Sequence, residues 1–176
     1  MDGMSPAIRI SLVTVSDGVS AGEREDRGGP ACEQALTDSG IEHTIVSREV
    51  LPDDRDRVAL AIRGRADRDE ADLVLLTGGT GVAPRDRTPE AVRDVIAFEI
   101  PGLAEKMRFE TGGSFAAAYL SRQVAGVRHR TIVIALPGSP RGAADCLRAI
   151  AGLIPHAVAL VRGEAPPHPQ PAGARA

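Results

Sequence analysis

Aromatic residues are nearly absent from this chain of 176 residues, which has no tryptophan, one tyrosine and three phenylalanines. Proteins that bind single-stranded nucleic acid stack its bases on aromatic side chains, so this composition argues against that function. The net charge of −3 provides no broad positive field for nucleic acid or an anionic membrane. The core must therefore be built from Val, Leu, Ile and Ala, in keeping with an apolar content of 43%.

Cysteine is equally scarce. Cys32 and Cys146 lie far apart and have neither the spacing of a metal site nor that of a disulfide framework, and the four histidines show no ligand spacing. The N-terminus has no basic segment followed by a long apolar one. No apolar run approaches the roughly 20 residues that span a bilayer. We therefore expect a cytoplasmic protein without a membrane partner.

The apolar pattern alternates between strands and helices. We expect one domain over residues 7–163, followed by a disordered tail rich in Pro and Ala over residues 164–176. Expected strands cover residues 7–15, 44–50, 73–76 and 131–136, and expected helices cover 30–39, 55–65, 90–99, 103–110, 115–121 and 143–161, the last with a kink near Pro155. Residues 16–22 are expected to form a loop, and residues 126–130 a turn. This order predicts a three-layer α/β/α fold with a mostly parallel sheet.

A glycine-rich loop stands at the centre of the sequence. A buried apolar run over residues 73–76 is followed directly by Thr77, Gly78, Gly79, Thr80 and Gly81. Glycine leaves backbone N–H groups unshielded and free to take unusual conformations, so such a loop can wrap a phosphate. A helix start follows, with Thr88 as the expected N-cap and Pro89 in the first turn.

The loop alone leaves its role open. A strand-to-helix turn rich in glycine can simply be a tight connection. The spacing differs from the Walker A and dinucleotide fingerprints. Asp86, between the loop and the helix, makes chemical sense if a metal ion bridges its carboxylate to bound phosphates.

Right-handed crossovers between parallel strands would bring three loops to one edge of the sheet. These are residues 16–22, 77–81 and 137–142, each of which follows an expected strand. We therefore predict that they converge on one pocket.

The complete set of motifs resembles one family. Thr-Gly-Gly-Thr-Gly at 77–81, followed by Arg-Asp-Arg-Thr-Pro-Glu-Ala at 85–91, resembles the signature of the Mog/MoaB molybdopterin-binding proteins. The likeness extends over residues 8–163 through Ser-Asp-Gly-Val-Ser-Ala-Gly at 16–22, Asp-Arg and Pro at 26–30, Leu-Pro-Asp at 51–53, Pro-Gly at 101–102, Leu-Ser-Arg at 120–122 and Leu-Pro-Gly-Ser-Pro at 136–140. Gly28 stands where the family usually has serine.

The resemblance implies a molybdopterin adenylyltransferase of molybdenum cofactor biosynthesis. Such an enzyme transfers AMP from ATP to the terminal phosphate of molybdopterin and releases pyrophosphate. Mg²⁺, a homotrimer, a mixed sheet whose last strand is antiparallel, and a separate molybdate-inserting partner protein are also implied. Asp53 and Asp86 correspond to the family's catalytic carboxylates, for which we expect metal binding and substrate orientation. From the sequence alone, Asp53 or Asp54 could equally cap the following helix.

The remaining site residues follow from the same motifs. Ser16, Asp17 and Ser20 are expected to bind the pterin or a phosphate, although Asp17 also suits a turn. Ser121 and Arg122 are assigned to the pterin side or a phosphate, with a surface salt bridge as the alternative for Arg122. Pro137, Gly138, Ser139 and Pro140 are expected to shape the pterin pocket. Arg85 and Arg87 either balance the charge of Asp86 or face solvent.

Two further functions compete with the enzyme. The chain could be a non-catalytic molybdopterin carrier of the MoaB type, against which the retention of both Asp53 and Asp86 argues. It could also be a generic nucleotide-binding α/β domain that acts on another substrate. The motifs do not separate the Mog branch from the MoaB branch.

Overall fold

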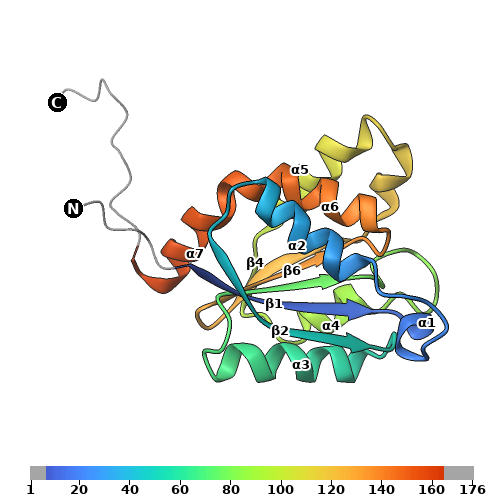
Figure 1. Cartoon of the computed structure of the whole chain (residues 1–176), viewed down its shortest axis with the longest axis horizontal. Coiled ribbons are helices and arrows are strands. Elements are labelled where there is room, and N and C mark those ends of the chain that lie inside the picture. Colours follow the sequence, from blue (N-terminus) through green and yellow to red (C-terminus); the bar gives the residue numbers. More distant parts are fainter. Residues whose placement is uncertain (1–6, 165–176) are drawn as a thin grey trace.

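The computed structural model of the chain describes residues 7–164, which form a six-stranded sheet between two layers of helices (Figure 1). The helices α2, α5 and α6 cover one face of the sheet, and α3 covers the other. The strands are β1 (Ile8–Val15), β2 (His43–Leu51), β3 (Leu73–Thr77), β4 (Phe98–Glu99), β5 (Ala125–Arg128) and β6 (Thr131–Leu136). The helices are α1 (Asp17–Ser20), α2 (Gly28–Asp38), α3 (Arg55–Asp67), α4 (Thr88–Arg93), α5 (Pro101–Gly112), α6 (Pro140–Ile150) and α7 (Ile154–Arg162), with 3₁₀ turns η1 (Ala116–Leu120) and η2 (Ala151–Leu153).

The sheet has the order β2-β1-β3-β6-β5-β4. The first four strands in this order are parallel, β5 is antiparallel to β6, and β4 is antiparallel to β5. The predicted three-layer fold with a mostly parallel mixed sheet is thus confirmed. The expectation that the last strand is antiparallel was wrong, because β6 pairs in parallel with β3 and the reversal occurs in β5.

The core lies on both faces of the two central strands, β3 and β6, which are buried along their whole length. Alternate residues of each strand face opposite helical layers, as the two-residue period of a strand requires. Leu73 and Leu75 of β3 pack on the α2, α5 and α6 side, whereas Val74 and Leu76 pack on the α3 and α4 side. Both faces are filled by aliphatic side chains, as the composition indicated.

The predicted turn at residues 126–130 is instead strand β5. A Cβ atom on Gly126 would lie 2.5 Å from Ile96 Cδ1 and 2.7 Å from the Phe98 carbonyl oxygen. Glycine therefore serves the close approach of β4 to β5 rather than a turn. The turn comes later, at His129, whose φ is +52°.

The predicted helix 90–99 is also shorter than expected. α4 ends at Arg93 because the following residues join the sheet, where the Ala97 N–H donates to the Val127 carbonyl at 2.7 Å. Arg87, not Thr88, is the N-cap, and the buried Thr88 hydroxyl has no hydrogen-bond partner in the described chain. The predicted loop 16–22 contains the short helix α1, whose N-cap is Ser16.

The predicted C-terminal helix begins earlier, at Pro140, and η2 interrupts it. By length and composition alone, Pro140–Arg162 could cross a membrane, so the expectation that no stretch reaches that length was wrong. Its apolar window is 39% buried, and its buried side chains, among them Leu147 and Ile150, belong to the main core cluster. Of the predicted tail, residues 165–176 lie outside the described residues, while the Glu164 N–H donates to the Ala159 carbonyl at 2.8 Å.

A pair of glycine substitutions tests how tightly the loop after β3 is packed. Gly78 has a φ of +111°, and a Cβ atom there would lie 2.0 Å from the Val15 carbonyl oxygen. Gly78→Ala should therefore lower the free energy of unfolding in urea by about 2–4 kcal/mol. The control Gly64→Ala lies within α3, where nothing comes closer than 3.5 Å. It should raise the free energy of unfolding by about 0.5–1 kcal/mol. Equal effects of the two substitutions would contradict this packing.

Candidate functional site

The loops after β1, β3 and β6 meet at one end of the sheet, as predicted. They enclose a cavity of about 390 Å³. Residues of all three loops line it, namely Ser16, Val19, Gly78, Gly79, Gly138 and Pro140, together with Thr77, Asp53 and Asp86. Sites in open parallel sheets commonly lie at this position, beyond the carboxyl ends of the strands.

The loops are packed backbone against backbone. In addition to the contact between Gly78 and Val15, a Cβ atom on Gly138 would lie 3.2 Å from the Cα atom of Gly78. The Gly78 N–H donates to the Leu136 carbonyl at 3.1 Å, and the Thr77 hydroxyl donates to the Pro137 carbonyl at 2.8 Å. These contacts fix the loop after β3 against the loop after β6.

Two glycines of the loop lie directly against the carboxylates singled out in the sequence. A Cβ atom on Gly79 would lie 3.0 Å from Asp53 Oδ1 and 2.4 Å from Thr88 Oγ1, and one on Gly81 would lie 2.7 Å from Asp86 Oδ2. The absence of side chains therefore makes room for Asp53 and Asp86. The sequence offered phosphate binding as the reason for these glycines, and the structure adds this second reason.

Only part of the loop is free to bind an anion. The Gly78 N–H is used by Leu136, which corrects the expectation that it is available. Within the described chain, the N–H groups of Gly79, Thr80 and Gly81 donate to no other group. The Thr80 hydroxyl lies 3.2 Å from the Ser121 hydroxyl, so both threonine hydroxyls bond to neighbouring segments. The anion-binding capacity of the loop therefore resides in three backbone N–H groups.

Asp17 and Asp53 hold each other in place. The Asp17 N–H donates to Asp53 Oδ2 at 2.9 Å, and the Asp53 N–H donates to Asp17 Oδ1 at 3.0 Å. Arg85 donates two hydrogen bonds to the Asp17 carboxylate, at 2.6 and 2.9 Å. Asp54 caps α3 by accepting from the Arg57 N–H, so the capping role does not fall on Asp53.

These contacts give the two carboxyl groups opposite electrostatic settings. Partial burial raises the pKa of Asp53, and the negative charges of Asp17 and Asp86 add to that effect. The hydrogen bonds from Arg85 hold the pKa of Asp17 below its usual value. Asp17 is thus a satisfied structural anion, whereas Asp53 is an anion in need of a positive partner.

Arg122 holds the glycine-rich loop after β3 in position through several hydrogen bonds. Its guanidinium donates to the carbonyl oxygens of Gly81 at 2.8 Å and Asp86 at 2.6 Å, and it forms an ion pair with Glu90. Its backbone N–H donates to the Thr80 carbonyl at 2.7 Å. The structure therefore gives Arg122 a positioning contact with the loop that carries Asp86.

Not every predicted site residue reaches the cavity. Ser16 lines it, but Ser20 is exposed and, like Asp17, is not part of its wall. Gly28 packs against Thr77, where a Cβ atom would lie 2.9 Å from Thr77 Cγ2. The usual serine of the motif would therefore need this contact to shift.

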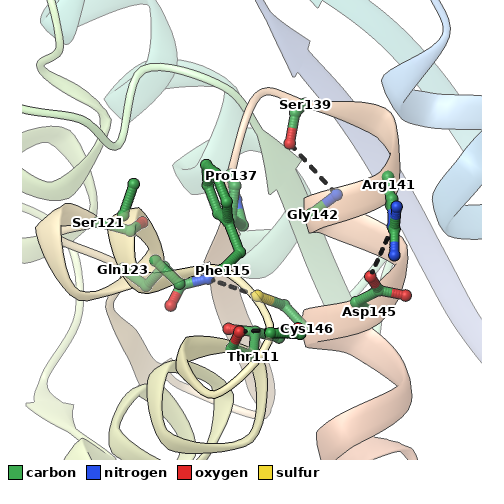
Figure 2. A pocket seen from close by; sticks show the side chains of 13 residues that line it. Thr111, Phe115, Ser121, Gln123, Pro137, Ser139, Arg141, Gly142, Asp145 and Cys146 are labelled. Carbon is green, nitrogen blue, oxygen red and sulfur yellow. Dashed lines mark hydrogen bonds and ion pairs between the residues drawn. The ribbon is translucent and has the colours of Figure 1, made fainter.

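A second cavity, of about 370 Å³, lies on the other side of the loop after β6, between α5, η1 and α6 (Figure 2). The four residues Pro137, Gly138, Ser139 and Pro140 divide between the two cavities. Pro137 and Ser139 line the second, and Gly138 and Pro140 line the first. Ser121 also faces the second cavity. One loop is therefore the common wall of two adjacent cavities.

Three residues that line the cavities were not predicted as site residues, namely Arg24, Arg27 and Gln123. Arg24 and Arg27 line the first cavity, and the Arg24 guanidinium lies so close to Gly18 that a Cβ atom there would be 2.6 Å from Nε. Arg24 forms no ion pair with a described residue. Gln123 lines the second cavity. Arg27 belongs to the Asp-Arg motif at 26–27 but had no role assigned to it, Gln123 adjoins the Leu-Ser-Arg motif, and no sequence pattern marks Arg24.

Among residues 7–164, no group of three or more His, Cys, Asp or Glu side chains could hold a metal ion. Asp53 and Asp86 are therefore a pair without further protein ligands of these types. A pair of carboxylates suits a cation that completes its coordination shell with water and substrate oxygens.

Comparison with known proteins gives consistent matches. A family model described as "Probable molybdopterin binding domain" matches residues 11–156. The molybdopterin adenylyltransferase of Helicobacter pylori (strain J99) is 37% identical over 156 residues, covering 89% of each chain. That of Escherichia coli (strain K12) is 36% identical over 143 residues, covering 81% of this chain and 73% of the relative. The crystal structure of the molybdopterin biosynthesis enzyme MoaB from Thermus thermophilus matches with a TM-score of 0.84 and 44% identity, covering 90% and 98% of the two chains.

Substitutions of Asp53 and Asp17, which hydrogen-bond to each other, should change the stability of the fold in opposite directions. Because the pKa of Asp53 is raised in the folded chain, stability is complete below the pKa of the unfolded chain and is lost as pH rises through the folded value. Asp53→Asn removes that loss and should raise the melting temperature at neutral pH in metal-free buffer. Because the pKa of Asp17 is lowered, its stabilisation is present above the unfolded pKa and is lost as pH falls through the folded one. Asp17→Asn should therefore lower the melting temperature.

The measurement is thermal unfolding of both variants and the unsubstituted chain at several pH values. The Asp53→Asn difference should shrink as the pH falls towards about 4, where aspartate protonates in unfolded chains, whereas the Asp17→Asn difference should persist there and shrink only at lower pH. A lower melting temperature for Asp53→Asn at neutral pH would contradict the conclusion that the charge of Asp53 destabilises the folded chain.

Proposed function

The chain belongs to the Mog/MoaB family of molybdopterin-binding proteins, and from that premise we propose that it is a molybdopterin adenylyltransferase of molybdenum cofactor biosynthesis. It transfers AMP from ATP to the terminal phosphate of molybdopterin and releases pyrophosphate. One observation carries the proposal beyond family membership: a single loop, Pro137 to Pro140, separates two cavities of similar volume, and one of them contains the carboxylate pair. A reaction between two bulky substrates needs such an arrangement, with the reacting groups meeting at the shared wall.

The first cavity suits the phosphates of ATP. Gly79 stands on its wall, and Thr80 and Gly81 follow it in the loop with unused backbone N–H groups. Arg24 and Arg27 also line the cavity, where Arg27 pairs with Glu25 at 3.4 Å. Backbone N–H groups and guanidinium groups are the usual partners of phosphate oxygens. The cavity thus combines the carboxylates of Asp53, Asp86 and Glu25 with the guanidinium groups of Arg24 and Arg27. A triphosphate with a bound cation matches both.

The second cavity suits the pterin. Its wall includes the apolar surfaces of Phe115, Ala117, Ala118 and Pro137 and a few polar groups. Flat heterocycles favour this combination of apolar surface with sparse hydrogen-bonding groups. Ser121 and Ser139 lie on this wall and are the candidates for contact with the ligand near its phosphate.

Asp53 and Asp86 fit Mg²⁺. Each presents carboxylate oxygens beside the glycine loop, and partial burial together with the charges of Asp17 and Asp86 raises the pKa of Asp53, as expected where a cation is needed. Mg²⁺ is usually held by one or two carboxylates together with substrate phosphates. When bound, it neutralises phosphate charge and orients the triphosphate.

The residues then perform positioning rather than proton transfer. A phosphate oxygen of molybdopterin attacks the α-phosphorus of ATP, the bond from that phosphorus to the bridging oxygen breaks, and pyrophosphate leaves with the electron pair. A phosphate monoester is already ionised near neutral pH, because its second pKa is about 6, so no general base is required. The chain's contribution is to hold two anions together, through the N–H groups of the loop and the arginines of the same cavity.

The branch of the family to which the chain belongs, Mog or MoaB, and its oligomeric state are predictions. The alternative function is a non-catalytic molybdopterin carrier of the MoaB type, which would use the second cavity and leave the carboxylate pair idle. A homotrimer, a cytoplasmic location and a separate molybdate-inserting partner follow from the resemblance. We expect no nucleic-acid partner and no membrane partner.

The decisive substitution is Asp86→Asn. The amide that it introduces keeps a side-chain oxygen that can accept the Ala83 N–H, which Asp86 Oδ2 accepts at 2.8 Å, so the fold should persist. Molybdopterin-dependent pyrophosphate release with ATP and Mg²⁺ should fall by at least about 100-fold, because a metal ligand is lost. Asp54→Asn removes the same charge at a helix N-cap, where Asn is as good as Asp, and should leave turnover unchanged.

Three outcomes separate the possibilities. Normal turnover of Asp86→Asn would overturn the metal role. Tight molybdopterin binding by the unsubstituted chain without any pyrophosphate release would establish the carrier. Loss of release in the Asp54→Asn control as well would indicate damage to α3 rather than to chemistry.

The role of Arg24 and Arg27 is tested by comparing the dissociation constants of ATP and AMP. If Arg24 and Arg27 hold the β- and γ-phosphates, the double variant Arg24→Gln and Arg27→Gln should raise the Kd of ATP about tenfold or more. The Kd of AMP should change less than about twofold. Arg63→Gln is the matched control, since Arg63 is exposed on α3 and lines neither cavity. An equal loss of ATP and AMP affinity would place these arginines at another part of the nucleotide.

A further inference from the structure

One polar group on the wall of the second cavity has no partner. In the described chain, three buried side-chain nitrogen or oxygen atoms make no hydrogen bond, and of these only Gln123 Oε1 belongs to a residue of this wall. Gln123 is 3% exposed and lies between η1 and β5. A buried carbonyl without a donor is unfavourable, so its retention beside a cavity points to a donor that arrives with a ligand.

The other half of the same amide is fixed. Gln123 Nε2 donates to Cys146 Sγ at 2.9 Å, as Figure 2 shows. Burial raises the pKa of the Cys146 thiol, which keeps the sulfur neutral. The amide nitrogen is therefore engaged with α6, and the carbonyl oxygen is the atom left for recognition.

The remaining polar groups of this wall already have partners. Ser139 Oγ accepts from the Gly142 N–H at 3.2 Å, and the Thr111 hydroxyl donates to the Met107 carbonyl at 2.7 Å. Asp145 pairs with Arg148 at 3.2 Å and with Arg141 at 3.5 Å. The unsatisfied hydrogen-bonding capacity of the wall is therefore concentrated at Gln123.

Gln123 also lies away from the loop that the two cavities share. Its partner Cys146 is six residues along α6 from Pro140, roughly 9 Å at the rise of an α-helix. In Figure 2 the Gln123 and Cys146 side chains lie well away from Ser139, which stands at the shared loop. A ligand with its phosphate at the shared loop would present its opposite edge to Gln123.

We propose that Gln123 determines specificity for the amino-pyrimidine edge of the pterin, with Oε1 accepting a hydrogen bond from the 2-amino group. This inference rests on the proposed function, in which the second cavity holds the pterin. An acceptor at this point favours a ring that carries a donor at the 2-position and disfavours one that carries a carbonyl there, because two acceptors would then face each other.

The test compares pterin with lumazine, which has a carbonyl in place of the 2-amino group. Kd values are measured by ligand fluorescence on the unsubstituted chain and on Gln123→Met and Gln123→Glu. The unsubstituted chain should bind pterin about tenfold more tightly than lumazine. Gln123→Met has no acceptor and should bind the two alike, whereas Gln123→Glu keeps an acceptor and should restore the preference. Gln34→Met, on the exposed surface of α2, is the control and should behave like the unsubstituted chain.

Melting curves of each variant, and molybdopterin-dependent pyrophosphate release by the unsubstituted chain, are measured alongside. If the unsubstituted chain released no pyrophosphate, the proposed reaction would be wrong, but the role of Gln123 would still be decided by the two affinities. Equal affinity of the unsubstituted chain for the two ligands, an unchanged preference in a folded Gln123→Met variant, or a preference for lumazine would each overturn the role of Gln123, whatever the outcome for release.

Discussion

The site depends on the absence of side chains in the loop after β3. A Cβ atom at position 78 would meet the Val15 carbonyl oxygen at 2.0 Å, one at 79 the Thr88 hydroxyl at 2.4 Å, and one at 81 the Asp86 carboxylate at 2.7 Å. Each of these contacts is shorter than any real Cβ contact, so three neighbours occupy the space that side chains would need. The loop can therefore lie against β1, the start of α4 and the carboxylates of Asp53 and Asp86 at once. Glycine here is a packing requirement as well as a source of exposed N–H groups.

This packing places opposite charges in one small space. Unused N–H groups of the loop attract anions, whereas Asp53 and Asp86 repel them, and the pKa of Asp53 is raised by partial burial and by the negative charges around it. Such a combination is poorly suited to a phosphate alone and well suited to a phosphate that brings a divalent cation. Asp17, neutralised by Arg85, and Arg122, fixed to Gly81 and Glu90, keep the carboxylates in position without competing for the ligand. The surrounding residues thus have structural tasks that the sequence motifs do not distinguish from ligand binding.

Much of the fold was predictable because the central strands have unmistakable apolar runs. Residues 73–76 and 131–136 are buried on both faces, and their loops converge as parallel topology requires. The errors came where tertiary contacts decide local structure. Gly126 has the composition of a turn but serves the close approach of β4. Residues 94–99 were predicted to be helical, but they form a turn and strand β4, which pairs with β5. Arg24 and Gln123 were missed because their importance comes from position in space alone. The competition between Asp53 and Asp54 for the helix cap likewise needed coordinates, since both positions carry the same residue type.

In the proposed reaction, two substrates occupy two cavities on either side of one loop. The most direct measurement is a crystal structure of the Asp53→Ala variant with molybdopterin and α,β-methylene-ATP, whose bridging carbon prevents transfer of AMP. We expect the triphosphate between Gly79 and the two arginines, Arg24 and Arg27, and the pterin against Gln123. The terminal phosphate of molybdopterin should meet the α-phosphate at the wall formed by Gly138 and Ser139. Both ligands in one cavity, or a pterin bound away from α6, would contradict it.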